Sequence, residues 1–169
     1  QNRLNWLPQE IKPATKADII YFAGCSPSYV NPKIAQATAR ILNAAGTEFM
    51  VLGGEEWCCG NPLYATGQVD AARKVMEHNI EAIAKSGAST VITSCAECYK
   101  TLKVDYPRML DKSTEEMGFR VLHIVEYAEE LMESGALKLD HPVEMRVTYH
   151  DPCQLGRLSE PWVPWHGER

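Results

Sequence analysis

The sequence lacks three features that mark other broad classes of protein: a long hydrophobic run, a signal-peptide core and an excess of basic residues. No apolar stretch approaches the roughly eighteen residues of a membrane-spanning helix, and the start, Gln1 to Leu4, is not the apolar core of an export signal. The formal net charge is −5 and the Lys and Arg residues are scattered, which disfavours a nucleic-acid partner. We therefore expect a cytoplasmic protein without direct membrane insertion. Gln1 in place of Met indicates a fragment or a processed piece.

Cysteine, by contrast, is present in a pattern. The chain of 169 residues has six cysteines, and five of them recur at spacings that suit a metal centre. Thiolate ligands select soft centres, namely iron–sulfur clusters, zinc or copper(I). These five, called the motif cysteines below, are Cys25, Cys58, Cys59, Cys95 and Cys98.

An even number of cysteines also permits a disulfide framework. The chain is long for a disulfide-stabilised domain and carries no visible export signal. A bridge between the adjacent Cys58 and Cys59 would be strained, far from normal disulfide geometry. A reduced metal site is therefore the favoured interpretation.

Short apolar runs alternate with helical periodicity along the chain. We expect strands over 19–23, 49–52, 90–93, 121–123 and 146–150, and helices over 32–45, 69–83, 98–105 and 124–133. This alternation predicts an α/β fold, a parallel sheet with flanking helices. Residues 1–16 are expected to form a connecting arm and residues 17–140 a first domain. Residues 145–169 are expected to begin a second, truncated repeat, since 147–154 parallel 20–27.

Cysteines follow several of the expected strands. Because ligands of parallel α/β sheets bind at the carboxyl ends of strands, the motif cysteines can converge at one edge of the sheet. Ser94 and Glu97 fit a capping box, which places Cys95 in the first turn of a helix where a thiolate is favoured. Gly60, directly after the cysteine pair, permits a positive φ and a close approach of the backbone to a bound cluster.

The residues alone leave several centres open. Five thiols exceed the four that tetrahedral zinc or a cubane cluster needs, so either one is spare or the centre is unusual. A structural zinc site is one alternative. Another is a thioredoxin-like dithiol at Cys95 and Cys98, although it leaves the other three motif cysteines without a role.

With Gly60, the motif cysteines resemble the cysteine-rich CCG domains of the catalytic subunit of heterodisulfide reductase. The same module occurs in iron–sulfur subunits of glycolate, lactate and glycerol-3-phosphate oxidation systems and in membrane complexes of sulfate reducers. Family members usually carry the motif twice. The residues from His150 to Arg157 resemble the start of a second copy, but the chain ends at Arg169 before another Cys-Cys-Gly.

The resemblance implies a noncubane [4Fe–4S] cluster held by all five motif cysteines, a centre that splits a disulfide in one-electron steps. It implies a ferredoxin-type domain or subunit as partner, and a membrane cytochrome subunit in a full complex. Relatives place two such clusters face to face, whereas this chain offers one motif and an unassigned Cys153. A small disulfide or thiol is the implied substrate.

Two functional hypotheses follow. In the first, the chain is an iron–sulfur electron-transfer or disulfide-reducing module of a larger oxidoreductase, with no catalytic residue assigned beyond the cluster ligands. In the second, it is a zinc-stabilised structural or binding module without redox activity. Around the motif, Glu56 is expected on a solvated face or tuning the site, and Lys100 and Lys103 could steer an acidic electron carrier. His123 and His150 end expected strands and could donate protons there.

Overall fold

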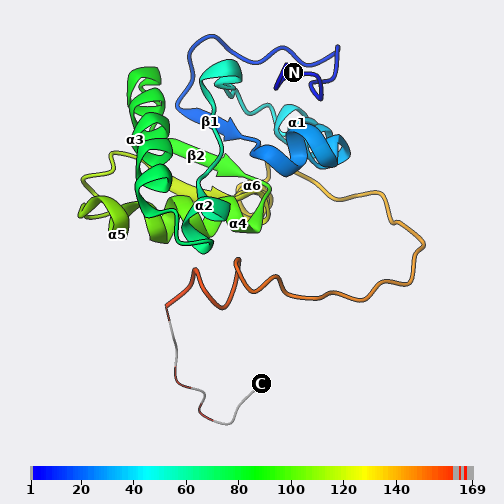
Figure 1. Ribbon diagram of the computed structural model, residues 1–169. Helices are drawn as coiled ribbons and strands as arrows, with labels where there is room; N and C mark the ends of the chain where they lie inside the picture. The colour runs from blue at the N-terminus through cyan, green and yellow to red at the C-terminus, as the bar shows by residue number, and fades with distance from the viewer. Residues whose placement is uncertain (1, 162–163, 165, 167–169) are drawn as a thin grey trace.

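The computed structural model describes residues 2–161, 164 and 166 and has a parallel sheet between two layers of helices (Figure 1). Three strands, β1 (Ile19–Phe22), β2 (Thr90–Thr93) and β3 (Arg120–His123), pair in the order β1-β2-β3. Both pairings are parallel, and the register aligns Tyr21 with Ile92 and Ile92 with Leu122. The predicted α/β class, a parallel sheet with flanking helices, is confirmed.

The connections between the strands are mainly helical. The α-helices are α1 (Pro32–Ala44), α2 (Asn61–Ala65), α3 (Val69–Ser86), α4 (Ala96–Lys100), α5 (Tyr106–Leu110) and α6 (Ile124–Glu133). Three short turns of other helical types complete them: η1 (Ser26–Val30), η2 (Gly53–Glu55) and η3 (Thr101–Asp105). In the described part of the chain, no helix has the length and apolar character needed to cross a membrane.

Side chains alternate between the two faces of the sheet, as the strand period of two requires. Ile20, Phe22 and Val91 contribute to one core, which they share with apolar residues of α3, η3 and α5. Tyr21 and Ile92 contribute to a second core, shared with α1, α6 and the N-terminal residues. The sheet is thus covered on both sides, which suits the apolar run of β1 and the complete burial of β2.

The N-terminal residues pack against the second core. Trp6 is 1% exposed and its ring meets the ring of Tyr21 edge to face, with centroids 5.4 Å apart. Ile11 is also buried in this cluster. Residues 2–16 therefore form part of the folded body, along the α1 side of the sheet (Figure 1).

Two of the five expected strands do not form as predicted. Over 49–52 only Met50 pairs, in a single parallel bridge to Ile20, because the chain turns immediately into η2 at Gly53, whose φ is +57°. Residues 146–150 form no strand, and Val147 and Tyr149 are 76% and 79% exposed. A segment with strand propensity forms a strand only when it has a neighbouring strand to pair with and a layer that covers it. This segment runs away from the sheet (Figure 1).

The helix expected over 98–105 is also different. It begins at Ala96, passes through the π-helical turn η3, and resumes at Tyr106 as α5, which contains Pro107. Pro107 lies in the first turn of α5, where a missing N–H disturbs no helical hydrogen bond. The predicted stop before Pro107 is therefore wrong. The expected second repeat, 145–169, includes residues 162, 163, 165 and 167–169, which lie outside the described residues.

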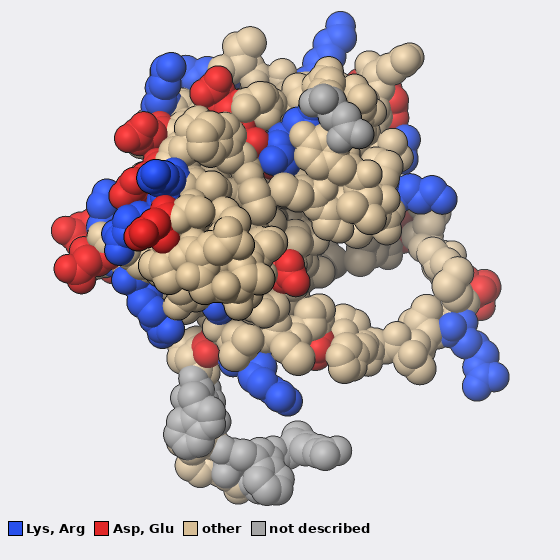
Figure 2. Space-filling view, in the orientation of Figure 1, with Lys and Arg blue, Asp and Glu red and all other residues tan. Residues whose placement is uncertain are grey.

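Charged residues of both signs lie intermixed on the surface. Figure 2 shows Lys and Arg beside Asp and Glu over the side of the molecule that carries α3 and α5, and a largely uncharged area in the middle of the same face. On this face neither sign forms an extended stripe.

Candidate metal centre

The motif cysteines lie side by side at the carboxyl edge of the sheet. Cys25 follows β1, and Cys95 follows β2 and precedes Cys98 in α4. The Cys58–Cys59 pair comes from the loop between η2 and α2. Each thiol shifts the pKa of its neighbour, and this order defines a row, called the thiol row below: Cys25, Cys58, Cys59, Cys98, Cys95.

The thiol row is partly shielded from solvent. Cys59 and Cys98, in its middle, are 5% and 3% exposed, whereas the other three are partly exposed. Within the described residues, no three His, Cys, Asp or Glu side chains surround one point closely enough to hold a single metal ion. Cys153 is exposed on the C-terminal segment and takes no part in the row.

Gly24 makes room for the thiol row. Its φ is +79°, and a Cβ added there would stand 2.7 Å from the Sγ of Cys98. Real side chains do not tolerate such a distance, so this glycine is required for space as well as for its backbone conformation. Gly60 differs: its φ is +93°, but an added Cβ would meet only Met76 and Ala72 of α3, at ordinary contact distances of 3.5 and 3.6 Å. The structure thus places the close approach to the thiols at Gly24.

Hydrogen bonding divides the thiols into proton donors and acceptors. The pKa of Cys95 is lowered to about 6, mainly by a hydrogen bond with the Cys98 thiol. Burial acts against this lowering, and the backbone amides of Cys98 and Glu97 act with it. Hydrogen bonds from Cys58 and Cys98 hold the pKa of Cys59 well below its usual range. The pKa values of Cys25 and Cys98 are raised, in each case first by the neighbouring thiol that accepts from it.

The capping box expected at α4 is not present. Cys95 itself precedes the first helical residue, and the Ser94 hydroxyl is instead 2.7 Å from the hydroxyl of Tyr21. A capping box occurs at α6, where the amide of His123 donates to Glu126 and the amide of Val125 donates to the His123 ring. The start of α4 still favours a thiolate at Cys95, because its first amides face that sulfur.

A buried ion pair, which the sequence did not indicate, adjoins the thiol row. The guanidinium of Arg3 lies 3.1 Å from the carboxylate of Glu56, and the two side chains are 9% and 3% exposed. Burial raises the pKa of Glu56 to about 7, against the lowering effects of Arg3 and of the amides of Gly24 and Ala23. The expectation that Glu56 lies on a solvated face is therefore wrong. Apolar residues at positions 4, 6, 7 and 11 were the one signal that this segment packs on the domain.

Asn79, a buried polar residue of α3, supports the loop that carries Cys58 and Cys59. Asn79 is fully buried and contacts the backbone on both sides of the Trp57–Cys58 peptide. Its amide also donates to the hydroxyl of Tyr106 at 3.0 Å. Trp57 is 46% exposed and stacks on His78, with ring centroids 3.7 Å apart.

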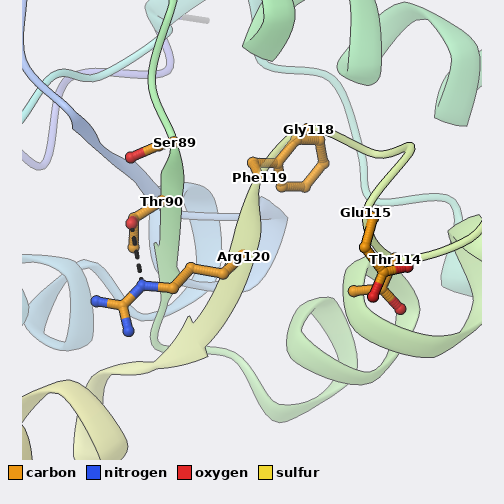
Figure 3. A pocket seen from close by; sticks show the side chains of 7 residues that line it. All are labelled: Ser89, Thr90, Thr114, Glu115, Gly118, Phe119 and Arg120. Atoms are coloured by element: carbon orange, nitrogen blue, oxygen red, sulfur yellow. Dashed lines mark hydrogen bonds between the residues drawn. The ribbon is translucent and has the colours of Figure 1, made fainter.

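A cavity of about 510 Å³ opens beside Cys58 of the thiol row. Two partly exposed aromatic rings and the Arg3–Glu56 pair form its walls. Its lining residues are Asn2, Arg3, Tyr29, Gly54, Glu56, Trp57, Cys58 and Val75. A second cavity, of about 490 Å³, lies near the amino ends of β2 and β3, where Thr90 and Arg120 line it, and no cysteine borders it (Figure 3). Of these two cavities, the one beside Cys58 adjoins a motif cysteine.

The lysines of α4 and η3 are engaged in ion pairs. Lys100 lies 2.6 Å from the fully buried carboxylate of Asp105, and Lys103 lies 2.8 Å from Glu160 of the C-terminal segment. Neither offers the unpaired cation expected of a docking site for an acidic carrier. His150 is exposed on the segment that forms no strand.

An α/β domain that collects five cysteine side chains at the carboxyl edge of a parallel sheet defines a cysteine-rich class of protein. The sequence profile of the cysteine-rich domain named CCG matches residues 19–103, half of the chain. The chain belongs to this family, which confirms the resemblance inferred from its cysteine pattern.

Several named proteins are similar in sequence to most of this chain. The chain is 45% identical, over 93% of its length, to one of the subunits of the dihydromethanophenazine:CoB–CoM heterodisulfide reductase of Methanosarcina barkeri, of which it covers 38%. It is 40% identical, over 81% of its length, to one of the subunits of the fumarate reductase (CoM/CoB) of Methanothermobacter marburgensis, covering 26% of that protein. It is 31% identical, over 90% of its length, to a probable iron–sulfur-binding oxidoreductase of Bacillus subtilis, covering 21%. The chain thus spans well under half of these relatives, and no solved structure gave a significant match.

Proposed function

We propose that the chain is an iron–sulfur redox module of a heterodisulfide-reductase-like oxidoreductase, with one [4Fe–4S] cluster of the noncubane type bound by the motif cysteines. The thiol row is the observation that carries this proposal. Five thiols arranged in one row, drawn from three separate segments, suit a centre with several metal ions better than a four-ligand site. The names of the relatives, two of which are reductases and one iron–sulfur-binding, support the same interpretation.

The chemistry of the donor set fits such a group. Packed thiols cannot all ionise at low cost without a compensating positive charge, because each thiolate disfavours its neighbours. A polynuclear iron centre supplies that charge, and thiolate sulfur is its preferred ligand. When bound, the cluster would provide single electrons for cleavage of a disulfide. The bare Cα of Gly24 keeps the space beside Cys98 open.

The chain's own residues define where a substrate would approach. Cys59 and Cys98 are buried and held away from solvent, whereas Cys58 borders the cavity beside Trp57. We place a small disulfide or thiol substrate in that cavity. A ferredoxin-type domain or subunit is the proposed electron partner, a membrane cytochrome subunit the proposed further partner, and the cytoplasm the proposed location.

Metal analysis of the chain, reconstituted anaerobically with iron and sulfide, tests the proposal. We expect about four irons and four sulfides per chain, without stoichiometric zinc. Stoichiometric zinc with no iron or sulfide would overturn the proposal and leave a structural zinc site.

The cluster type is tested by the five single Cys→Ser variants of the motif cysteines. A noncubane cluster that uses all five loses iron or changes its paramagnetic-resonance spectrum in every variant. A cubane needs only four ligands. One variant with four irons and an unchanged spectrum would therefore refute the five-ligand assignment.

A further inference from the structure

The carboxylate of Glu56 joins the two loops that carry the first three motif cysteines. Its Oε2 accepts from the amide of Ala23 at 3.1 Å and its Oε1 from the amide of Gly24 at 2.9 Å. These amides directly precede Cys25, while Glu56 stands two residues before Cys58. One buried side chain thus fixes the main chain of the first loop relative to the second.

Arg3 extends this arrangement to the thiol row itself. Its Nη1 donates to the carboxylate of Glu56 at 3.1 Å and to the hydroxyl of Ser28 at 3.4 Å. Its Nη2 lies 3.7 Å from the Sγ of Cys25, as a donor to that sulfur. The guanidinium also stands over the ring of Tyr29, 5.4 Å from its centroid.

A purely structural role is the simplest alternative for a buried ion pair. Such pairs contribute little net stability, because desolvation offsets much of the attraction between the charges. The orientation of this pair points to a more specific role. The carboxylate is turned toward backbone amides and Arg3, whereas the guanidinium places an N–H group against the sulfur of Cys25.

We propose that Arg3 and Glu56 are positioning residues of the metal centre: Glu56 fixes the loop that presents Cys25, and Arg3 hydrogen bonds to the Cys25 sulfur and makes the bound cluster easier to reduce. The second half of this inference rests on the proposed function. Hydrogen bonds to ligand sulfurs and the net charge near a cluster are established determinants of its potential. A donor to a ligand sulfur stabilises the more negative, reduced state.

The effect of Arg3 is measured by redox titration of the reconstituted chain, followed by paramagnetic resonance. R3M keeps an apolar stem but removes every donor and the charge. At a fixed potential we expect its ratio of reduced to oxidised cluster to fall about tenfold, which is about 59 mV for a one-electron couple. R3K, which keeps a charged donor, should shift less. R40M is the matched control, because Arg40 is exposed and pairs with Glu10.

The role of Glu56 is measured without any cluster. In the metal-free chain, E56Q leaves one carbonyl oxygen in place of two carboxylate oxygens, so we expect hydrogen exchange at the Ala23 and Gly24 amides to accelerate about tenfold or more. The amides of β2 serve as internal controls.

The outcomes separate the two proposals. Full iron content with an unchanged potential in R3M refutes the tuning role and leaves the proposed function intact. Unchanged amide exchange in E56Q refutes the positioning role, whatever the chain binds. A wild-type chain that binds no iron refutes the proposed function and the tuning role with it, while the exchange measurement still decides the role of Glu56.

Discussion

The side-chain amide of Asn79, in the middle of α3, donates to the main-chain carbonyl of Cys58 at 2.8 Å. Its oxygen accepts from the amide of Trp57 at 3.0 Å, so one buried side chain satisfies the backbone of the loop just where the adjacent cysteines begin. The loop has no regular secondary structure here and would otherwise bury unpaired polar groups.

Replacing Asn79 by alanine should therefore destabilise the metal-free chain. Two backbone groups and the Tyr106 hydroxyl lose their partner, at a cost of about 2–4 kcal/mol in the free energy of unfolding. Urea denaturation measures it. N43A, on the exposed side of α1, is the control and should stay within about 0.5 kcal/mol of wild type. Equal stabilities for the two variants would show that Asn79 does not support the loop.

Gly24→Ala should abolish metal retention, whereas Gly87→Ala should not. The two glycines have nearly the same φ, +79° and +78°, so both variants carry a similar backbone strain, about 1 kcal/mol or more. Only at Gly24 does the new Cβ collide with a thiol, that of Cys98 at 2.7 Å; at Gly87 nothing lies within 4 Å. Iron per chain after reconstitution distinguishes them. Full occupancy in G24A would mean that the thiol row tolerates displacement.

Serine at Cys58 or Cys59 should reduce the iron content far more than serine at Cys153. The first two lie within the thiol row, and Cys153 is exposed and outside it. C153S thus serves as the control for the general effect of removing a thiol. Equal iron loss in all three variants would make Cys153 a ligand and would require a different ligand set.

Protonation of His123 should destabilise the metal-free chain as the pH falls below about 6.5. Burial lowers the pKa of this ring below its ordinary value of 6.5, against the raising effects of Glu126 and Ser94. At His123 the unfolded chain therefore binds more protons than the folded chain in the window below 6.5, and protonation of this ring favours unfolding there.

H123N removes this titration and keeps a side chain able to cap α6. Relative to wild type, the urea midpoint of H123N should rise as the pH falls below 6.5, whereas that of H141N should follow wild type, since His141 is 97% exposed. Identical pH profiles for wild type and H123N would show that the ring does not contribute.

Much of the scaffold could be predicted from local pattern. The apolar runs that become β1 and β2, the periodic residues of α3 and the bounds of α6 are signals contained within a few residues. The meeting of the motif cysteines followed from one topological rule, that parallel strands present their carboxyl ends at a common edge.

The remaining features depend on partners far away in the sequence. Arg3 meets Glu56 across 53 positions, and no local pattern relates them. The segment around Val147 has the composition of a strand, yet in the described structure it lies exposed, because a strand needs a neighbour to pair with. The π-helical turn before Pro107 changes the backbone hydrogen-bond pattern to i→i+5. A rule based on proline alone does not predict this change.

The spread of the thiol row over the chain bears on when during biogenesis the proposed cluster could be inserted. Cys25 reaches Cys95 only after β1 has paired with β2, whose aligned residues Ile19 and Thr90 are distant in sequence. Such non-local pairing is slow compared with helix formation. In small zinc domains, by contrast, the ion itself drives folding. Under the proposed function, the chain would fold before the cluster is inserted, and its partly exposed thiols would have to stay reduced until iron and sulfide arrive.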